Sequence, residues 1–259
     1  MNSREISDRL SGLPLKWNSF GYDKFGISKR DLSRFFSLSH IFYEHYFRVE
    51  TIGIEHVPEH GRGMIVGNHS GGWALDGWMT LASCFFAKNP PRLAHGMAEK
   101  FMGKAPFVSA LTHKVGQITG LPENARALLE DERLLMVFPE GARGTAKLFD
   151  QRHSLVRFGT GFLRLALENK TPIIPFAFLG GGEAIPTVAN LVKLGKFIGV
   201  PYIPITKYLL PVPKPVQLKI VYGKPMHFDG NGTEDDATVE RWVGEVQAKI
   251  ASLLEVAKQ

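Results

Sequence analysis

The chain has 259 residues, of which 44% are hydrophobic and 22% charged, a composition that excludes extensive disorder and suits one large α/β domain or two small ones. The single cysteine, Cys84, excludes an intramolecular disulfide, and no stretch reaches the roughly 20 apolar residues that a membrane-spanning helix needs. The N-terminus has no uninterrupted apolar core of signal-peptide length, so we expect a protein of the reducing cytoplasm.

The first predicted element is a helix within residues 28–47, where apolar side chains recur at helical spacing behind a capping residue, Ser28. This helix is amphipathic, with several phenylalanines on one face and basic residues near its start. Such a face suits either a membrane interface or packing on the protein's own domain. We therefore divide the chain into an N-terminal helical segment, residues 1–45, that is a candidate for membrane association, and an α/β domain, residues 46–259.

The rest of the chain alternates strands with helices. Short apolar runs predict strands within 48–57, 63–68, 134–138, 173–179 and 216–223. Helical patterns lie within 122–132 and 159–170, and the clearest helix follows residue 238, with apolar residues three and four apart. This alternation predicts an α/β fold with a mixed, largely parallel central sheet flanked by helices.

Residues Ala184 to Phe228 contain no aspartate or glutamate but carry six lysines, an excess equal to the net charge of +6 of the whole chain. Aromatic and aliphatic residues alternate with these lysines, which favours a surface that faces anionic lipid headgroups. A solvated strand edge is the second interpretation. Nucleic acid is the third, and we do not expect it as a partner because no nucleic-acid-binding motif accompanies the lysines. The sequence thus predicts a peripheral protein on the inner face of a membrane.

The segment "GNHSGGWALDGW", residues 67–78, pairs a histidine with a distant carboxylate. In one continuous helix His69 and Asp76 would be about 10 Å apart along the axis, too far for a hydrogen bond. Gly71 and Gly72 can fold a bend that brings them together at the carboxyl edge of a sheet. A carboxylate on one imidazole nitrogen leaves the other free to accept a proton, so His69 would be a general base. A chance pairing is the alternative.

A second polar cluster follows the strand predicted at 134–138. Glu140, Gly141 and Arg143 stand at its carboxyl end, where Arg can grip a phosphate and Glu can accept a hydrogen bond from a hydroxyl. A local surface pair between Glu140 and Arg143 is the alternative interpretation.

Together "NHSGGWALD", "VFPEGARG" and "TPIIPFAFLGGGE" resemble, in order and spacing, the motifs of the glycerolipid acyltransferase family, the lysophospholipid acyltransferase superfamily. The resemblance covers about residues 45–225. Two features depart from the family pattern. Six residues rather than four separate His69 from Asp76, and the stretch that commonly carries a phosphate-binding arginine has Leu121 and Pro122 instead. Either Arg126 substitutes for it, or the acceptor lacks a phosphate, as in the monoacylglycerol and diacylglycerol acyltransferase-like branch.

The resemblance implies transfer of an acyl group from acyl-CoA or acyl-carrier protein to a hydroxyl of a lipid. His69 would be the general base and Asp76 would orient it, with backbone N–H groups near Gly71 and Gly72 as candidates to stabilise the oxyanion. The predicted substrate-binding residues are Ser70, Gly71, Gly72, Glu140, Gly141 and Arg143. No metal or cofactor is expected beyond the acyl thioester co-substrate, and the sequence assigns no oligomeric state.

Two rival functions remain. Ser70 beside His69 raises the possibility of a hydrolase of acyl thioesters or lipids, although the G-x-S-x-G pattern of such enzymes is absent. A non-catalytic peripheral lipid-binding protein would use the basic and aromatic surface and would tolerate the loss of His69.

Overall fold

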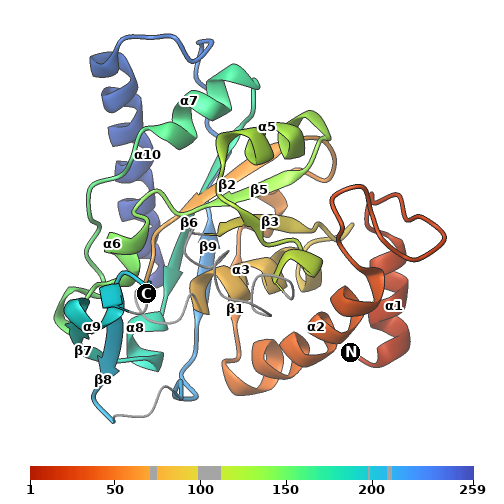
Figure 1. Ribbon diagram of the computed structural model, residues 1–259, viewed down its shortest axis with the longest axis horizontal. Helices are drawn as coiled ribbons and strands as arrows, with labels where there is room; N and C mark the ends of the chain where they lie inside the picture. Colours follow the sequence, from red (N-terminus) through yellow and green to blue (C-terminus); the bar gives the residue numbers. More distant parts are fainter. Residues whose placement is uncertain (71–74, 99–111, 198, 209–211) are drawn as a thin grey trace.

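A sheet of seven strands, counted over the residues that the structure describes, forms the centre of the molecule (Figure 1). The computed structural model describes residues 1–70, 75–98, 112–197, 199–208 and 212–259. In spatial order the strands are β1 (Glu50–Ile52), β9 (Lys219–Tyr222), β6 (Ile173–Leu179), β2 (Gly63–Gly67), β5 (Leu134–Val137), β3 (Ala94–Ala98) and β4 (Ile118–Thr119). Neighbouring strands are parallel except β6 and β9, which confirms the predicted mixed, largely parallel sheet.

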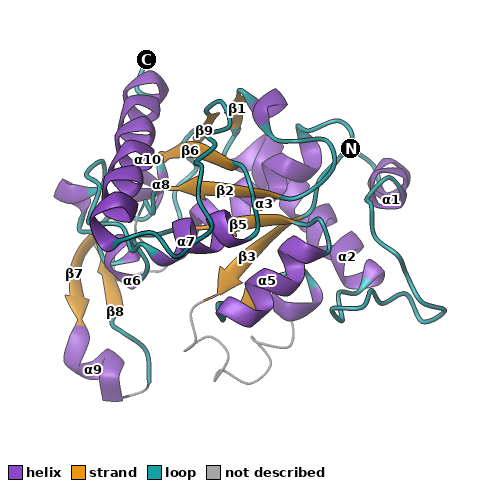
Figure 2. Cartoon of the chain, turned by 90° about the horizontal axis from the view of Figure 1, so that it is seen from above, coloured by secondary structure: helices purple, strands orange, loops and turns teal. Residues whose placement is uncertain are grey.

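Helices cover both faces of this sheet, as the view from above shows (Figure 2). One face packs against α1 (Ser3–Ser11), α2 (Lys29–His40) and α3 (Leu75–Phe86), and the other against α5 (Pro122–Glu130), α7 (Gly161–Glu168) and α10 (Asp236–Ala257). The central strand β2 shows why its sequence is a continuous apolar run. Ile65 belongs to the first core, while Met64 and Val66 belong to the second, because successive side chains of a strand point to opposite faces.

The N-terminal segment packs on the domain rather than standing apart from it. Ser28 caps α2 by accepting a hydrogen bond from the Asp31 N–H, as expected. The phenylalanine face of this helix turns inward: Leu32 and Phe36 are fully buried, and the Phe36 ring stacks on Phe85 of α3 with centroids 3.6 Å apart. Of the two interpretations of this helix, packing on its own domain is therefore the one that the structure supports, because the apolar side of α3 also needs a cover.

The C-terminal helix α10 is the longest helix among the described residues and matches its predicted stripe. Asp235 caps it by accepting a hydrogen bond from the Thr238 N–H, and Val243, Val246 and Ile250 are buried along one side. Neither α10 nor another helix of the described parts is long and apolar enough to cross a bilayer.

Two short helices follow strands at the carboxyl edge of the sheet, α6 (Ala142–Thr145) after β5 and α8 (Gly181–Ala184) after β6. Beyond α8 the chain forms an antiparallel pair of strands, β7 (Thr187–Leu191) and β8 (Ile203–Thr206), linked through α9 (Val192–Phe197). This pair is a separate sheet that projects from the body in both ribbon views (Figures 1 and 2). The sequence indicated one basic segment in this part of the chain, and no pattern in it predicted that the segment would project from the body.

Candidate active site

His69 and Asp76 lie together at the carboxyl edge of the central sheet. His69 stands two residues beyond the end of β2, and Asp76 is the second residue of α3, which begins only at Leu75. The imidazole Nδ1 and the carboxylate Oδ2 are 3.0 Å apart. The two side chains are thus within hydrogen-bonding distance. The predicted oxyanion donors, Gly71 and Gly72, lie outside the described residues.

Asp76 is fully buried, and hydrogen-bond donors surround its carboxylate. Oδ2 accepts hydrogen bonds from the Ser70 N–H (2.8 Å) and the Ser70 hydroxyl (3.3 Å), and Oδ1 accepts from the Gly77 N–H (2.7 Å). Burial by itself raises the pKa of Asp76, but the charge on His69 and these donors outweigh it and hold the pKa below its usual value. Asp76 is therefore an ionised partner for His69 at neutral pH.

Ser70, a predicted substrate-binding residue, is directed to the Asp76 carboxylate. Both its backbone N–H and its hydroxyl are directed to Asp76, and the residue is 3% exposed. Gly181 of α8 packs so closely that a Cβ there would stand 2.0 Å from the Ser70 Oγ. Ser70 thus holds the carboxylate in place, and its predicted substrate contact stays a prediction.

The face of the His69 imidazole ring is also in contact with the protein. Its ring stacks on Phe138, the residue after β5, with centroids 4.2 Å apart and planes 13° apart. The side chain remains 12% exposed. Asp76 Oδ2 accepts a hydrogen bond from the Nδ1–H group, and Nε2 has no hydrogen-bond partner in the described part of the chain. This arrangement leaves Nε2 ready to accept a proton from a bound molecule.

A buried ion pair holds the backbone of His69 from both ends. Glu140 Oε1 accepts a hydrogen bond from the His69 N–H (2.9 Å), and Lys147 Nζ donates to the His69 carbonyl (2.7 Å). The two side chains form an ion pair of 2.6 Å and are almost completely buried. Burial lowers the pKa of Lys147, an effect that the charge of Glu140 opposes. The pair fixes the peptide unit that carries the imidazole.

Glu140, a predicted substrate-binding residue, has several partners within the protein. Its second oxygen also accepts a hydrogen bond from the Val156 N–H (2.9 Å), so both oxygens are occupied within the protein. A hydrogen bond from a substrate hydroxyl to Glu140 stays a prediction. The alternative of a surface pair with Arg143 is wrong, because the partner of Glu140 is Lys147. Sequence reasoning noted Lys147 in the loop after this strand but did not pair it with Glu140.

Two glycines let the chain after β5 approach His69. Gly141 has φ +56° and ψ −152°, a conformation that essentially only glycine adopts, and it turns the chain into α6. A Cβ on Gly144 would stand 2.7 Å from the Cβ of His69 and 2.6 Å from that of Glu140. The structure thus gives Gly141 a backbone role, while its predicted substrate contact stays a prediction, and it makes Gly144 a part of the site that the sequence did not indicate.

The two arginines considered for a phosphate have protein partners. Arg143 is exposed and donates a hydrogen bond to the Arg157 carbonyl (3.1 Å). Arg126, on α5, pairs with Glu168 of α7 at 2.9 Å. The Arg143 side chain belongs to α6, beside Gly144, whereas no contact among the described residues joins Arg126 to the His69 loop. A phosphate contact by Arg143 stays a prediction.

Asn68 is a further residue that sequence reasoning passed over. It is 1% exposed, its amide donates a hydrogen bond to the Phe178 carbonyl (3.0 Å), and its side-chain oxygen accepts one from the Phe178 N–H (2.8 Å). The side chain thereby continues the pairing of β2 with β6 after the strand itself has ended. Its place directly before His69 was the available signal.

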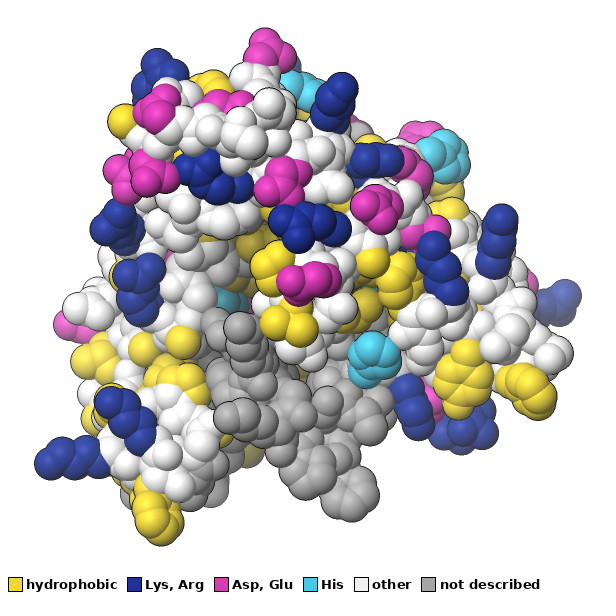
Figure 3. Space-filling view, turned by 45° about the horizontal axis from the view of Figure 1, so that its top comes forward, with side chains coloured by type: hydrophobic (Ala, Val, Ile, Leu, Met, Phe, Trp, Pro, Cys, Tyr) yellow, Lys and Arg dark blue, Asp and Glu magenta, His cyan; other side chains and the backbone are white. Residues whose placement is uncertain are grey.

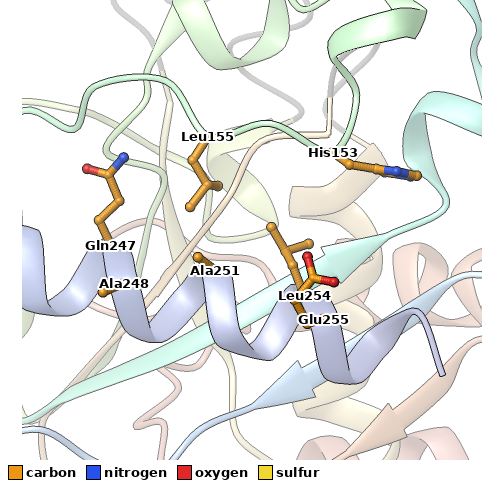
Figure 4. A pocket seen from close by; sticks show the side chains of 7 residues that line it. All are labelled: His153, Leu155, Gln247, Ala248, Ala251, Leu254 and Glu255. Carbon is orange, nitrogen blue, oxygen red and sulfur yellow. The ribbon is translucent and has the colours of Figure 1, made fainter.

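A cavity of about 280 Å³ lies away from these residues, between the loop at 153–155 and α10 (Figure 4). Leu155, Ala251 and Leu254 form much of its apolar lining. None of the predicted site residues lines it. The hydrogen bonds around His69, and not this cavity, define the candidate site.

Replacement of Lys147 by methionine tests the role of the buried ion pair. The variant leaves the Glu140 carboxylate without its charged partner, and breaking a buried pair in this way costs about 3–5 kcal/mol. For a chain of this size we expect the melting temperature to fall by about 10 °C. The measurement is thermal unfolding followed by circular dichroism.

The matched control is Lys24→Met, which breaks an exposed ion pair with Asp131 (2.7 Å). It should cost less than about 1 kcal/mol. Equal melting temperatures for the Lys147 and Lys24 variants would show that the buried pair does not hold the loop.

Comparison with known proteins gives a family match and a fold match. The family model described as Acyltransferase matches residues 48–179. The crystal structure of the 1-acyl-sn-glycerophosphate (LPA) acyltransferase PlsC from Thermotoga maritima superposes with a TM-score of 0.57, at 17% identity, over 86% of this chain and 79% of that one. At this identity the superposition shows a shared fold.

Two curated proteins are similar to this chain in sequence. An uncharacterised protein of Mycobacterium tuberculosis is 32% identical over 231 residues, which are 85% of this chain and 62% of the relative. A protein of Bos taurus described as a DGAT1/2-independent enzyme synthesizing storage lipids is 28% identical over 212 residues, 78% of this chain and 58% of the relative. The chain thus spans about three fifths of the length of the curated relatives that it matches.

Proposed function

Because the chain belongs to the Acyltransferase family and is an acyltransferase enzyme, we propose that it moves a fatty acyl group from an acyl thioester to a hydroxyl of a glycerolipid. The observation that carries this proposal is the 3.0 Å contact between the His69 Nδ1 and the Asp76 carboxylate. It sits at the carboxyl edge of a largely parallel sheet, where α/β proteins bind their ligands. Acyl-CoA or acyl-carrier protein would supply the thioester.

The proposed reaction uses His69 Nε2 as the general base. The acceptor hydroxyl gives its proton to Nε2 while its oxygen attacks the thioester carbonyl carbon, and Asp76 stabilises the imidazolium that forms. Collapse of the tetrahedral intermediate breaks the carbon–sulfur bond, and the departing thiolate takes the proton back from His69. The products are an ester and a free thiol, and the enzyme returns to its starting state without a metal.

The class of acceptor is supported by the names of two similar proteins. PlsC is described as an acyltransferase of 1-acyl-sn-glycerophosphate, and the bovine relative as an enzyme that synthesises storage lipids. The first description names a glycerolipid that carries a phosphate, and the second names storage lipids. Since Arg126 is paired with Glu168 in this chain, Arg143 is the arginine beside the His69 loop that would meet a phosphate.

We place this reaction at the inner face of a membrane, with the protein bound peripherally to an anionic leaflet. Glycerolipid acceptors reside in bilayers, and the basic, acid-free segment from Ala184 to Phe228 supports attachment to anionic headgroups.

The test is an assay of purified protein with labelled acyl-CoA or acyl-carrier protein and a panel of acceptors. The panel contains lysophosphatidic acid, other lysophospholipids, monoacylglycerol and diacylglycerol, and mass spectrometry identifies the labelled product. We expect one acylated glycerolipid. If a phosphorylated acceptor is used, Arg143→Ala should raise its KM, and if a neutral one is used, that variant should leave the KM unchanged. Free fatty acid as the sole product would indicate a hydrolase, and lipid binding without any product would indicate a carrier. Either result would overturn the proposal.

A further inference from the structure

Exposed apolar side chains gather on the projecting pair of strands. Among the described residues fifteen large hydrophobic side chains are exposed, and six of them lie on β7, on α9 and shortly after β8. These six are Val188, Leu191, Val192, Leu194, Phe197 and Tyr208. Phe197 is 87% exposed, the highest value in this group. Exposed apolar side chains that gather on one part of a protein surface mark an interaction surface.

Cations accompany this patch, and acids are absent from it. Lys193, Lys196 and Lys207 are exposed, and no ion pair joins them to another residue of the described chain. The whole stretch from Ala184 to Phe228 has no aspartate or glutamate. We use the name hairpin surface for the six apolar residues above together with Lys193, Lys196 and Lys207. Figure 3 shows yellow and dark blue side chains side by side at the lower left of the molecule.

Two other lysines of the same acid-free segment have partners among the described residues. Lys219 lies on β9, where its ammonium is 3.6 Å from the Glu50 carboxylate. Lys214 lies over the Tyr208 ring, 4.0 Å from its centroid, and donates a hydrogen bond to the hydroxyl of that tyrosine. Lys219 is thus paired with a carboxylate, whereas Lys214 borders the hairpin surface at Tyr208, an aromatic residue whose hydroxyl and ring suit a boundary between water and lipid.

We propose that the hairpin surface docks the protein on an anionic lipid bilayer, with Phe197 and Leu194 entering the headgroup and acyl boundary and the three lysines facing lipid phosphates. Protein interfaces are depleted of lysine at their centres, so lysines interleaved with exposed apolar side chains fit a bilayer better than a protein partner. The packing of α2 supports the same assignment, because its phenylalanine face is buried in the domain core and is not free to enter a membrane.

The hairpin surface is joined to the candidate active site. The Asn190 amide of β7 donates a hydrogen bond to the Ala146 carbonyl (2.6 Å), and the Tyr202 hydroxyl donates one to Thr145 Oγ1. Both contacts are with the end of α6, the helix whose Gly144 packs on His69. Docking here would bring the bilayer to the side of the molecule that holds the His69 loop. This second step rests on the proposed function, whereas the docking does not.

The experiment is co-sedimentation of the full chain with phosphatidylcholine vesicles that contain or lack phosphatidylglycerol. We expect the unsubstituted protein to bind the anionic vesicles. Lys193→Glu/Lys196→Glu/Lys207→Glu should weaken the partition coefficient at least about a hundredfold, since each basic residue near the surface contributes about fivefold and the new carboxylates are repelled by the anionic headgroups. Leu194→Ser/Phe197→Ser should weaken it about tenfold or more. These side chains are exposed, so melting temperatures should stay unchanged.

Matched controls carry the same changes elsewhere on the surface. Lys16→Glu/Arg30→Glu/Lys249→Glu makes the same change in net charge, and Phe20→Ser removes a phenylalanine that is 85% exposed. Both controls should bind as the unsubstituted protein does. The docking proposal is overturned if the unsubstituted chain does not bind anionic vesicles, or if the hairpin variants bind as well as the controls.

An activity assay on the same variants separates this proposal from the proposed function. With a short-chain acceptor dispersed as monomers in water, the hairpin variants should keep full turnover, and with a vesicle-bound acceptor they should lose it in proportion to binding. If vesicle binding depends on the hairpin surface but neither the unsubstituted chain nor any variant transfers an acyl group, the docking proposal stands and the proposed function is refuted.

Discussion

Replacing His69 with alanine is expected to lower kcat for acyl transfer by about 10²–10⁴, the usual contribution of a general base. Nε2 is the ring nitrogen that Asp76 leaves unprotonated, so without the imidazole the acceptor hydroxyl must lose its proton to water. The measurement is the initial rate of labelled ester formation at saturating thioester and acceptor. Binding of both substrates should change little, because the interaction is made in the transition state.

Two further variants make this result specific. His69→Gln places an amide near Asp76 but offers no basic nitrogen, so it should be as inactive as the alanine variant with a smaller effect on folding. His227→Ala removes an exposed histidine and should keep full turnover. A His69→Gln protein with turnover close to that of the unsubstituted chain would refute proton transfer at this residue.

Replacing Asp76 with asparagine is expected to lower kcat by a similar factor, about 10²–10⁴. Asparagine has the shape of the carboxylate but carries two N–H donors of its own. At the position of Oδ2 its amide group would donate to His69 Nδ1, which places the imidazole proton on Nε2 and leaves no base there. If its oxygen takes that position instead, the Gly77 N–H loses its acceptor, at a cost of about 1–3 kcal/mol in the free energy of unfolding.

Asp23→Asn is the matched control for this substitution. Asp23 is also a buried carboxylate, which accepts hydrogen bonds from two backbone N–H groups and from Arg133. Its loss should destabilise the fold by a comparable amount, yet turnover per folded molecule should be unchanged. If Asp76→Asn and Asp23→Asn lower turnover equally, the effect of Asp76 is on folding and not on the imidazole.

The sheet and its helices could be predicted because their residues carry local patterns. The runs in β2 and β5 are apolar throughout since both faces of a central strand are buried, and the stripe of α10 has a helical period. The contact between His69 and Asp76 followed from a similarly local fact. Two glycines between the residues permit a bend, and a general base needs a carboxylate beside its other ring nitrogen, so the sequence predicted that the two residues meet.

The residues that support His69 could not be predicted in the same way. Lys147 meets the His69 carbonyl across 78 positions, and no periodicity links the two. Glu140 carried a strong motif, but a motif does not show whether a carboxylate faces a substrate or a backbone N–H, because that depends on how deeply the loop is buried. The acid-free segment from Ala184 to Phe228 was recognised as basic, yet only the folded chain shows that Lys219 lies beside Glu50 while Lys193 stays exposed.

The helix α2 shows the same limit from another side. Its phenylalanine face fits a membrane interface and a protein core equally well by composition. What decides between them is a partner with its own apolar surface, here α3 with Phe85 against Phe36. Such a partner is visible only in three dimensions.

The most direct test of the central claim, that Asp76 acts through His69, is a double-mutant cycle on kcat/KM for acyl transfer with His69→Ala, Asp76→Asn and the double variant. Residues that work as one unit are strongly non-additive. The proposed mechanism predicts that the double variant is no slower than His69→Ala alone. Losses that multiply, or an Asp76→Asn variant that keeps the turnover of the unsubstituted chain, would contradict it.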